Sequence, residues 1–121
     1  MSFSGNLIAE SLRVGSDLEV ARAVRRVRRV DVGDTGVGQP AVWTFLEVVV
    51  ANEDVDRFVQ LVSGAIEPGP WYCDLASDDE TVVVFADRVF RYPRGDAAGR
   101  AEAESHARAA GVPEAQIDWP A

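Results

Sequence analysis

The sequence predicts a small α+β domain in which a mainly antiparallel sheet carries two helices packed on one face. Three observations lead to this fold class. Several short runs are rich in β-branched and aromatic residues, two longer segments have helical periodicity, and strands and helices come in separate groups along the chain. With 121 residues the chain has the usual size of one domain, so we expect one core spanning residues 1–121.

Residues 7–14 and 41–50 are two predicted strands of the first half. Residues 7–14 are mostly apolar and stop at Gly15, which indicates an opening strand. Residues 41–50 combine valine, tryptophan and phenylalanine and lie between turn signals. They are therefore the clearest strand of the chain.

Residues 20–32 fit two kinds of secondary structure. Val20, Val24 and Val27 have the spacing of a helix stripe, whereas the same arginine-rich run also suits an extended edge strand. The loop at residues 34–40, with two glycines and a closing proline, joins this segment to the next strand. That arrangement favours a strand over a helix.

The clearest helix follows Asn52. This residue is a good N-cap, and the acidic residues after it suit the positive end of a helix dipole. The run Pro68-Gly69-Pro70 ends the helix. One apolar face is marked by Val55, Phe58, Val59, Val62 and Ile66.

The second half of the chain predicts three more strands. Residues 71–75, 81–85 and 88–92 have strand composition, and residues 77–80 form a polar turn between the first two. Only residues 86–87 join the last two strands, so these two are expected to form a hairpin.

A second helix and a docked tail close the chain. Asp96 is placed to cap a helix that runs to about Ala110, and Gly111 suits the left-handed position that follows a helix. The tail, residues 112–119, contains Trp119 and other apolar side chains. We therefore expect it to pack against the domain.

Charge and composition exclude several classes of protein. The formal net charge is −8, from 20 acidic and 12 basic residues, so no global positive field attracts nucleic acid or an anionic membrane. No apolar run approaches the roughly 18 residues that span a bilayer, and no secretory-signal pattern is present. The single cysteine, Cys73, cannot form an internal disulfide, and we expect a cytoplasmic location. All 12 basic residues are arginine, which is typical of GC-rich bacterial genomes.

No residue is predicted to be catalytic, and no metal or cofactor is expected. His106 is the single histidine, and Glu102 and Glu104 beside it are expected to keep it cationic rather than make it a base. Cys73 lies on a predicted strand, where a buried and inert thiol is the usual state. The glycines of the 34–40 loop lack the lysine and the spacing of a phosphate-binding loop.

Residues 88–96 carry the main binding hypothesis. Arg91 and Arg94 lie where a strand ends and the last helix begins, and the N–H groups of a helix start favour anions. Tyr92, and Trp71 from another strand, could complete a recognition surface. The alternative is that Arg91 and Arg94 form ion pairs with acidic residues, of which the chain has an excess.

Several segments resemble a group of small uncharacterised bacterial proteins. They are Gly5-Asn6-Leu7-Ile8-Ala9-Glu10-Ser11-Leu12, Gln39-Pro40 to Trp43-Thr44, Trp71-Tyr72, Val83-Val84-Phe85 through Arg94-Gly95-Asp96, and Gly111-Val112-Pro113-Glu114 with Asp118-Trp119. The resemblance covers nearly the whole chain. It implies a single bacterial domain and no catalytic residue.

These observations leave two hypotheses on function. The first is a non-enzymatic binding or interaction domain that recognises a protein partner or a small anion, with a homodimer joined through the sheet as one form of it. The alternative is a small enzyme that uses carboxylates such as Asp74 or Glu80 in a pocket beside the aromatic residues. Two carboxyl groups that converge in one apolar cleft would favour the enzyme.

Overall fold

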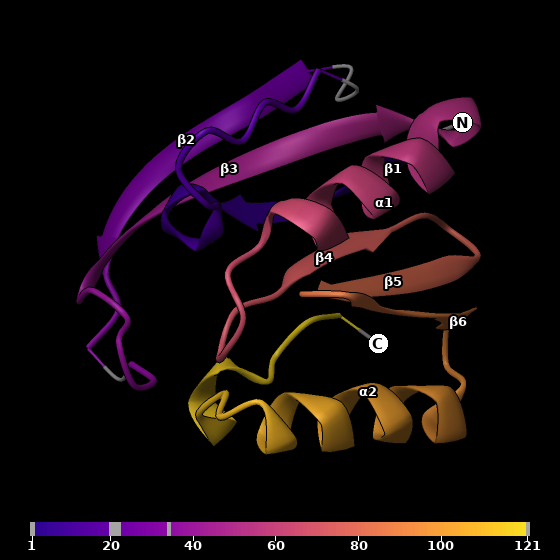
Figure 1. Ribbon diagram of the computed structural model, residues 1–121. Helices are drawn as coiled ribbons and strands as arrows, with labels where there is room; N and C mark the ends of the chain where they lie inside the picture. Colours follow the sequence, from indigo (N-terminus) through magenta and orange to yellow (C-terminus); the bar gives the residue numbers. More distant parts are fainter. Residues whose placement is uncertain (1, 20–22, 34, 121) are drawn as a thin grey trace.

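A computed structural model describes residues 2–19, 23–33 and 35–120 (Figure 1). Within these residues, one antiparallel sheet has the strand order β2-β3-β1-β4-β5-β6, which confirms the predicted α+β class. The strands are β1 (Ser2–Ile8), β2 (Ala23–Asp31), β3 (Val42–Ala51), β4 (Cys73–Ala76), β5 (Glu80–Phe85) and β6 (Arg88–Pro93). The helices are α1 (Val55–Ala65) and α2 (Ala97–Ala109), with short 3₁₀ turns at Ala9–Ser11, Asn52–Asp54 and Glu114–Gln116.

The opening strand begins and ends earlier than predicted. β1 pairs with β3 from Ser2 opposite Ala51 to Ile8 opposite Phe45. After Ile8 the chain turns into a 3₁₀ helix, and the Ser11 hydroxyl donates to the Ile8 carbonyl oxygen at 2.6 Å. Towards its start, the strand alternates the polar residues Ser2, Ser4 and Asn6 with residues of the opposite face such as Phe3 and Leu7. This is the pattern of a strand with one buried face, and it extends β1 back to Ser2.

The arginine-rich segment is a strand and not a helix, which is the alternative that the loop after it favoured. β2 lies at one edge of the sheet and pairs with β3, with a bulge between Val24 and Arg26. Two of its valines remain exposed, since Val24 is 51% and Val27 61% accessible. Residues 20–22 of the predicted segment lie outside the described residues.

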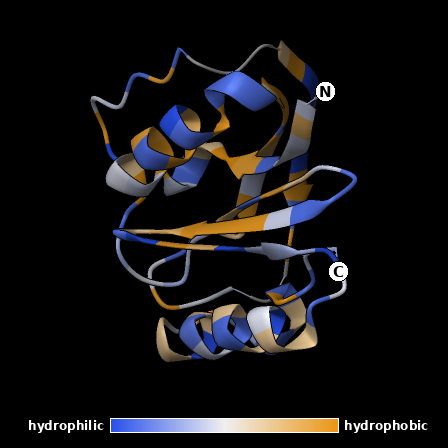
Figure 2. Cartoon of the chain, turned by 90° about the vertical axis from the view of Figure 1, so that its right-hand side faces the viewer, coloured by the Kyte–Doolittle hydropathy of each residue, from blue (hydrophilic) through white to orange (hydrophobic). Residues whose placement is uncertain are grey.

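The prediction that both helices pack on one face is wrong, because the two helices cover opposite faces of the sheet (Figures 1 and 2). β5 contacts both layers. Val82 and Val84 join the core that contains α1, whereas Val83 and Phe85 join a second core with Ala103 and other α2 residues. Successive residues of a strand point to opposite faces, so a strand that is apolar at every position needs cover on both.

The second helix and its tail are built as predicted. The Asp96 carboxylate accepts from the Gly99 N–H at 3.2 Å, which caps α2, and Gly111 has a positive φ of 92° just after the helix. The tail then returns across the sheet, and Trp119 is 2% exposed. α2 contacts β6 most closely, so the β1, β3 and β2 half of the same face carries no helix (Figure 1).

None of the helices in the described residues is long and apolar enough to cross a membrane.

Gly5 provides a test of how closely β1 and β4 approach each other. A β-carbon at Gly5 would stand 1.8 Å from the carbonyl oxygen of Asp74, which is backbone and cannot move aside. We expect Gly5→Ala to lower the free energy of unfolding by about 3 kcal/mol or more, measured by urea denaturation. Gly64→Ala is the matched control. A β-carbon there meets nothing within 4 Å in α1, so this variant should gain about 0.5–1 kcal/mol. A stable Gly5→Ala protein would contradict the close strand contact.

Candidate functional site

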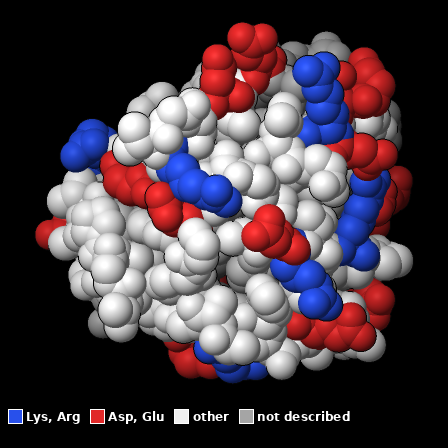
Figure 3. Space-filling view, viewed as in Figure 1, with Lys and Arg blue, Asp and Glu red and all other residues white. Residues whose placement is uncertain are grey.

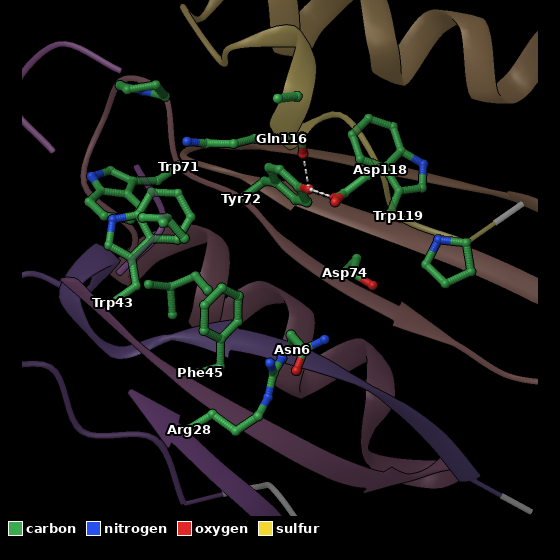
Figure 4. A pocket seen from close by; sticks show the side chains of 15 residues that line it. Asn6, Arg28, Trp43, Phe45, Trp71, Tyr72, Asp74, Gln116, Asp118 and Trp119 are labelled. Carbon is green, nitrogen blue, oxygen red and sulfur yellow. Dashed lines mark hydrogen bonds between the residues drawn. The ribbon is translucent and has the colours of Figure 1, made fainter. Parts of the chain in front are cut away.

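A pocket of about 460 Å³ opens on the sheet face that α2 leaves uncovered (Figure 4). Its floor comes from β2, β3, β1 and β4, and one wall comes from the C-terminal tail. The lining residues are Asn6, Ile8, Arg28, Val32, Trp43, Phe45, Pro70, Trp71, Tyr72, Asp74, Ala115, Gln116, Asp118, Trp119 and Pro120.

The register of the sheet brings the floor residues together. Asn6 of β1 pairs with Asp74 of β4, and Phe45 of β3 pairs with Ile8 on one side and Arg28 on the other. Directly opposed residues in antiparallel strands share a face. Side chains from four strands therefore meet on one surface although they are far apart in sequence.

Aromatic rings form much of the pocket wall. The Trp43 and Trp71 ring centroids are 5.1 Å apart, and Trp43 also contacts Phe45 at 6.0 Å. The Trp43 indole N–H donates to the Pro40 carbonyl oxygen at 2.8 Å, which holds that ring in place. All three tryptophans of the chain, Trp119 included, line this pocket.

The tail is held as a wall by polar contacts, of which the one between Trp119 and Tyr92 is buried. The Trp119 indole N–H donates to the Tyr92 hydroxyl at 2.8 Å, and Arg100 of α2 donates to the Trp119 carbonyl oxygen at 2.8 Å. On the pocket side, the Tyr72 hydroxyl contacts the Gln116 carbonyl oxygen and lies 3.2 Å from Asp118 Oδ1 (Figure 4). The tail is therefore attached to both the sheet and α2.

Asp74 is the most perturbed acid of the pocket. Burial, and secondly the negative charge of Asp118, raise the pKa of Asp74 from its ordinary 3.8 to about 6. Burial first, and then the negative charges of Asp74 and Asp118, raise the pKa of Tyr72 above its usual range. Within the described residues, no side chain makes a hydrogen bond or ion pair with the Asp74 carboxylate, which faces the pocket (Figure 4).

Arg28 is the single cationic residue of the lining. Its guanidinium lies over the Phe45 ring, 4.9 Å from the centroid, on the β2 side of the pocket. The pocket thus has Asp74 and Asp118 on one side and Trp43 and Trp71 on the opposite side, with Asn6, Phe45 and Arg28 on the floor between them in this view (Figure 4).

The structure separates the four residues predicted for ligand binding. Arg91 lies on the α1 side of β6, where its guanidinium makes two hydrogen bonds to Glu80, at 2.6 and 3.0 Å, and one to Asp56 at 2.6 Å. Arg91 therefore stands away from the start of α2, and the predicted group of two arginines and a helix N-terminus is not assembled. Figure 3 shows the same pattern more widely, with arginines beside acidic side chains on the face in view.

The other three predicted residues have different surroundings. Tyr92 is 5% exposed and its hydroxyl serves Trp119. The Arg94 guanidinium donates to the Ser77 carbonyl oxygen at 3.1 Å, in the loop before β5. Trp71 alone belongs to the aromatic pocket, and its binding role stays a prediction.

The single histidine differs from its predicted state. His106 packs against the rings of Phe85 and Phe90, with centroids 4.6 and 5.4 Å away. Burial and the nearby Arg88 lower the pKa of His106, so the cationic form expected from its acidic sequence neighbours is disfavoured. Those neighbours are on its own helix, whereas Arg88 comes from β6.

The structure buries the thiol and separates the two acids that were named for the enzyme hypothesis. Cys73 is fully buried against α1, and burial raises the pKa of its thiol. No cluster of three or more histidine, cysteine or acidic residues that could hold a metal ion occurs in the described part of the chain. Of the two acids named for the enzyme hypothesis, Asp74 lies in the pocket and Glu80 is bound to Arg91 outside it.

Sequence reasoning missed Asn6, Arg28, Gln116 and Asp118 as site residues. Asp74 carried the one available signal, since a carboxylate in the middle of a mostly apolar strand requires a reason. The others come from an outer strand, from the first strand and from the tail, and their meeting depends on strand order and on the docking of the tail.

No protein-family model, curated protein or solved structure matches the chain.

The raised pKa of Asp74 predicts a measurable effect of pH on stability. Between pH of about 4 and about 6 the folded state binds more protons at Asp74 than the unfolded state does, so stability falls as pH rises through this window. Above it, the ionised carboxylate lowers the free energy of unfolding. Asp74→Asn should remove this dependence and raise stability at pH 7 by about 1–2 kcal/mol in urea denaturation. Asp17→Asn, at an exposed loop position, is the control. Equal pH profiles for Asp74→Asn and the parent chain would contradict the assignment.

Tyr92→Phe tests whether Tyr92 supports the tail. The change leaves the buried indole N–H of Trp119 without its acceptor, so we expect a loss of about 1–2 kcal/mol in the free energy of unfolding. A double-mutant cycle with Trp119→Phe should show that the two losses are not additive. Additive losses would mean that the two side chains do not depend on each other.

Proposed function

We propose that this chain is a binding domain and that the aromatic pocket is its ligand site. The observation that supports this most strongly is Asp74, whose carboxyl group faces the pocket and accepts a hydrogen bond from its own backbone N–H but has no side-chain partner among the described residues (Figure 4). Removing a carboxylate from water costs free energy unless a partner compensates for it. Burial of the Asp74 carboxylate does not stabilise the fold. A ligand group that pairs with this carboxylate would explain why it is there.

The size and lining of the pocket suit a small organic molecule. A volume of about 460 Å³ is within the range of ligand sites, which are mostly apolar and contain a few polar groups that orient the ligand. Here the apolar surface comes from Trp43, Trp71 and Phe45, and the polar groups include Asp74 and Asn6.

The same lining argues against the small anion considered from the sequence. Asp74 and Asp118 stand at one end of the pocket and would repel a negative charge. Arg91, the strongest candidate for binding an anion, already has Glu80 and Asp56 as partners. The ligand of the pocket is therefore expected to be neutral or cationic.

A fragment screen followed by NMR tests this proposal. The three indole N–H groups give separate signals and all belong to pocket residues, so binding fragments should shift these signals and quench tryptophan fluorescence. Ala115→Phe, which places a ring at the edge of the pocket, should abolish or weaken binding at least tenfold. Ala98→Phe makes the same change on the exposed side of α2 and should bind like the parent chain.

Two results would count against the pocket as the ligand site. One is a set of fragments that bind equally well to Ala115→Phe and to the parent chain. The other is a set whose chemical-shift changes lie away from β1, β4 and the tail.

A small enzyme is the second candidate, favoured by the two carboxyl groups in one aromatic-lined pocket. A carboxyl group with a pKa of about 6, as at Asp74, can act as a general acid or base near neutral pH. Asp118 could serve as the second carboxylate. Each bound fragment should be incubated with the parent chain and with Asp74→Asn at pH 6 and examined by mass spectrometry. Product that depends on Asp74 would establish the enzyme, whereas unchanged fragments support the binding domain.

A further inference from the structure

We propose that the ligand of this pocket carries a protonated amine, which binds between Asp74 and Asp118, and an apolar body that lies against the tryptophans. This inference rests on the proposed function and names the chemical class of the ligand. It is carried by the distribution of charge and aromatic surface along the pocket (Figure 4).

Among the described residues that line this pocket, none beside Asp74 and Asp118 is cationic. Asp118 lies close enough to Asp74 for its charge to disfavour ionisation of the Asp74 carboxyl group. Neither carboxylate forms an ion pair with Arg28 among the described residues, and the guanidinium of that arginine lies over Phe45. A bound ammonium group would compensate both carboxylates at once and would relieve their mutual repulsion.

One oxygen of this acidic end is already oriented. The Tyr72 hydroxyl lies 3.2 Å from Asp118 Oδ1, and its ring packs edge-on against Trp119 at 5.1 Å. Asp118 is exposed, but its backbone belongs to the docked tail, which keeps its carboxylate beside Tyr72. A carboxylate placed in advance loses less conformational entropy when it binds an ammonium group.

The aromatic side of the pocket, opposite Asp74 and Asp118, suits the rest of such a ligand (Figure 4). Ammonium groups are attracted to the faces of aromatic rings, and the carbon atoms beside them pack well on the same surface. Trp71 and Trp43 lie next to each other, with Phe45 beyond them towards β2. An amine with a short aromatic or aliphatic body would contact these rings while its charge stays near Asp74.

Other ligand classes fit the same residues less well. An anion would meet two carboxylates, and a neutral alcohol of the same shape would leave the Asp74 charge uncompensated. A zwitterion could also reach Arg28, but the amine would still supply the contact at the acidic end.

Three probes of similar shape and different charge test the inference. Tryptophan fluorescence, excited where a phenyl group does not absorb, is titrated with phenethylamine, 2-phenylethanol and 3-phenylpropionate at pH 7.5 and low salt. We expect phenethylamine to bind at least tenfold more tightly than 2-phenylethanol, and 3-phenylpropionate to bind most weakly.

Matched variants assign the effect to the acidic end. Asp74→Asn should weaken phenethylamine binding to within about threefold of 2-phenylethanol, while the affinity for 2-phenylethanol stays the same. Asp118→Asn should weaken the amine as well, with a smaller fold-change. Asp17→Asn removes the same charge from an exposed loop and should leave all three affinities unchanged.

The outcomes separate this inference from the proposed function. If 2-phenylethanol or 3-phenylpropionate binds as tightly as phenethylamine, the amine class is overturned and the pocket remains the ligand site. The same conclusion follows if Asp74→Asn leaves phenethylamine binding unchanged. If none of the three probes alters the fluorescence or the indole signals, the result counts against the amine class and also against the pocket as the ligand site.

Discussion

The structure depends on one strand that has no polar face. β5 is buried at Val82, Val83, Val84 and Phe85, so both sides of the sheet must be covered where it runs. α1 covers one side, and α2 with the returning tail covers the other. Because burial of apolar surface is the main favourable contribution to folding, this requirement decides where the two helices lie.

The pocket is a consequence of the way that the second side is covered. α2 packs against β6 and β5, and the tail adds a short wall beside β4. The strands β1, β3 and β2 lie beyond this cover (Figure 1). A floor of sheet residues and a wall of tail residues then enclose a hollow that neither element would form alone (Figure 4).

The polar groups of the pocket illustrate a balance between stability and binding. Asp74 lies on β4 opposite Asn6, and its carbonyl oxygen comes so close to the neighbouring Gly5 that no side chain fits at that position of β1. Its carboxylate is removed from much of the solvent and stands near a second negative charge. Ligand-binding sites commonly contain ionisable groups with shifted pKa values, such as Asp74. A carboxylate that has no side-chain partner in the free protein can pair with a group of the ligand.

Much of the architecture was predictable from local patterns. Residues 41–50, the capped helix after Asp96 and the hairpin around residues 86–87 follow from composition, capping and turn length, and the structure contains all three. Local patterns say little about which face of a sheet a helix covers, and the placement of α1 and α2 on one face was wrong. Likewise, Arg91 and Tyr92 are neighbours in sequence and point to opposite faces, so proximity in sequence suggested a common site that the strand geometry separates.

By itself, the sequence determined the elements, the acidic composition and the presence of a tail too apolar to remain in solvent, because these depend on short-range propensities and on hydrophobic periodicity. Only the tertiary structure decided that Asn6, Arg28, Asp74 and Asp118 share one pocket. Their meeting depends on strand order, register and tail docking, which are set by contacts between segments up to a hundred residues apart, on the order of the whole chain. The candidate site of this protein is therefore a property of its packing more than of any local motif.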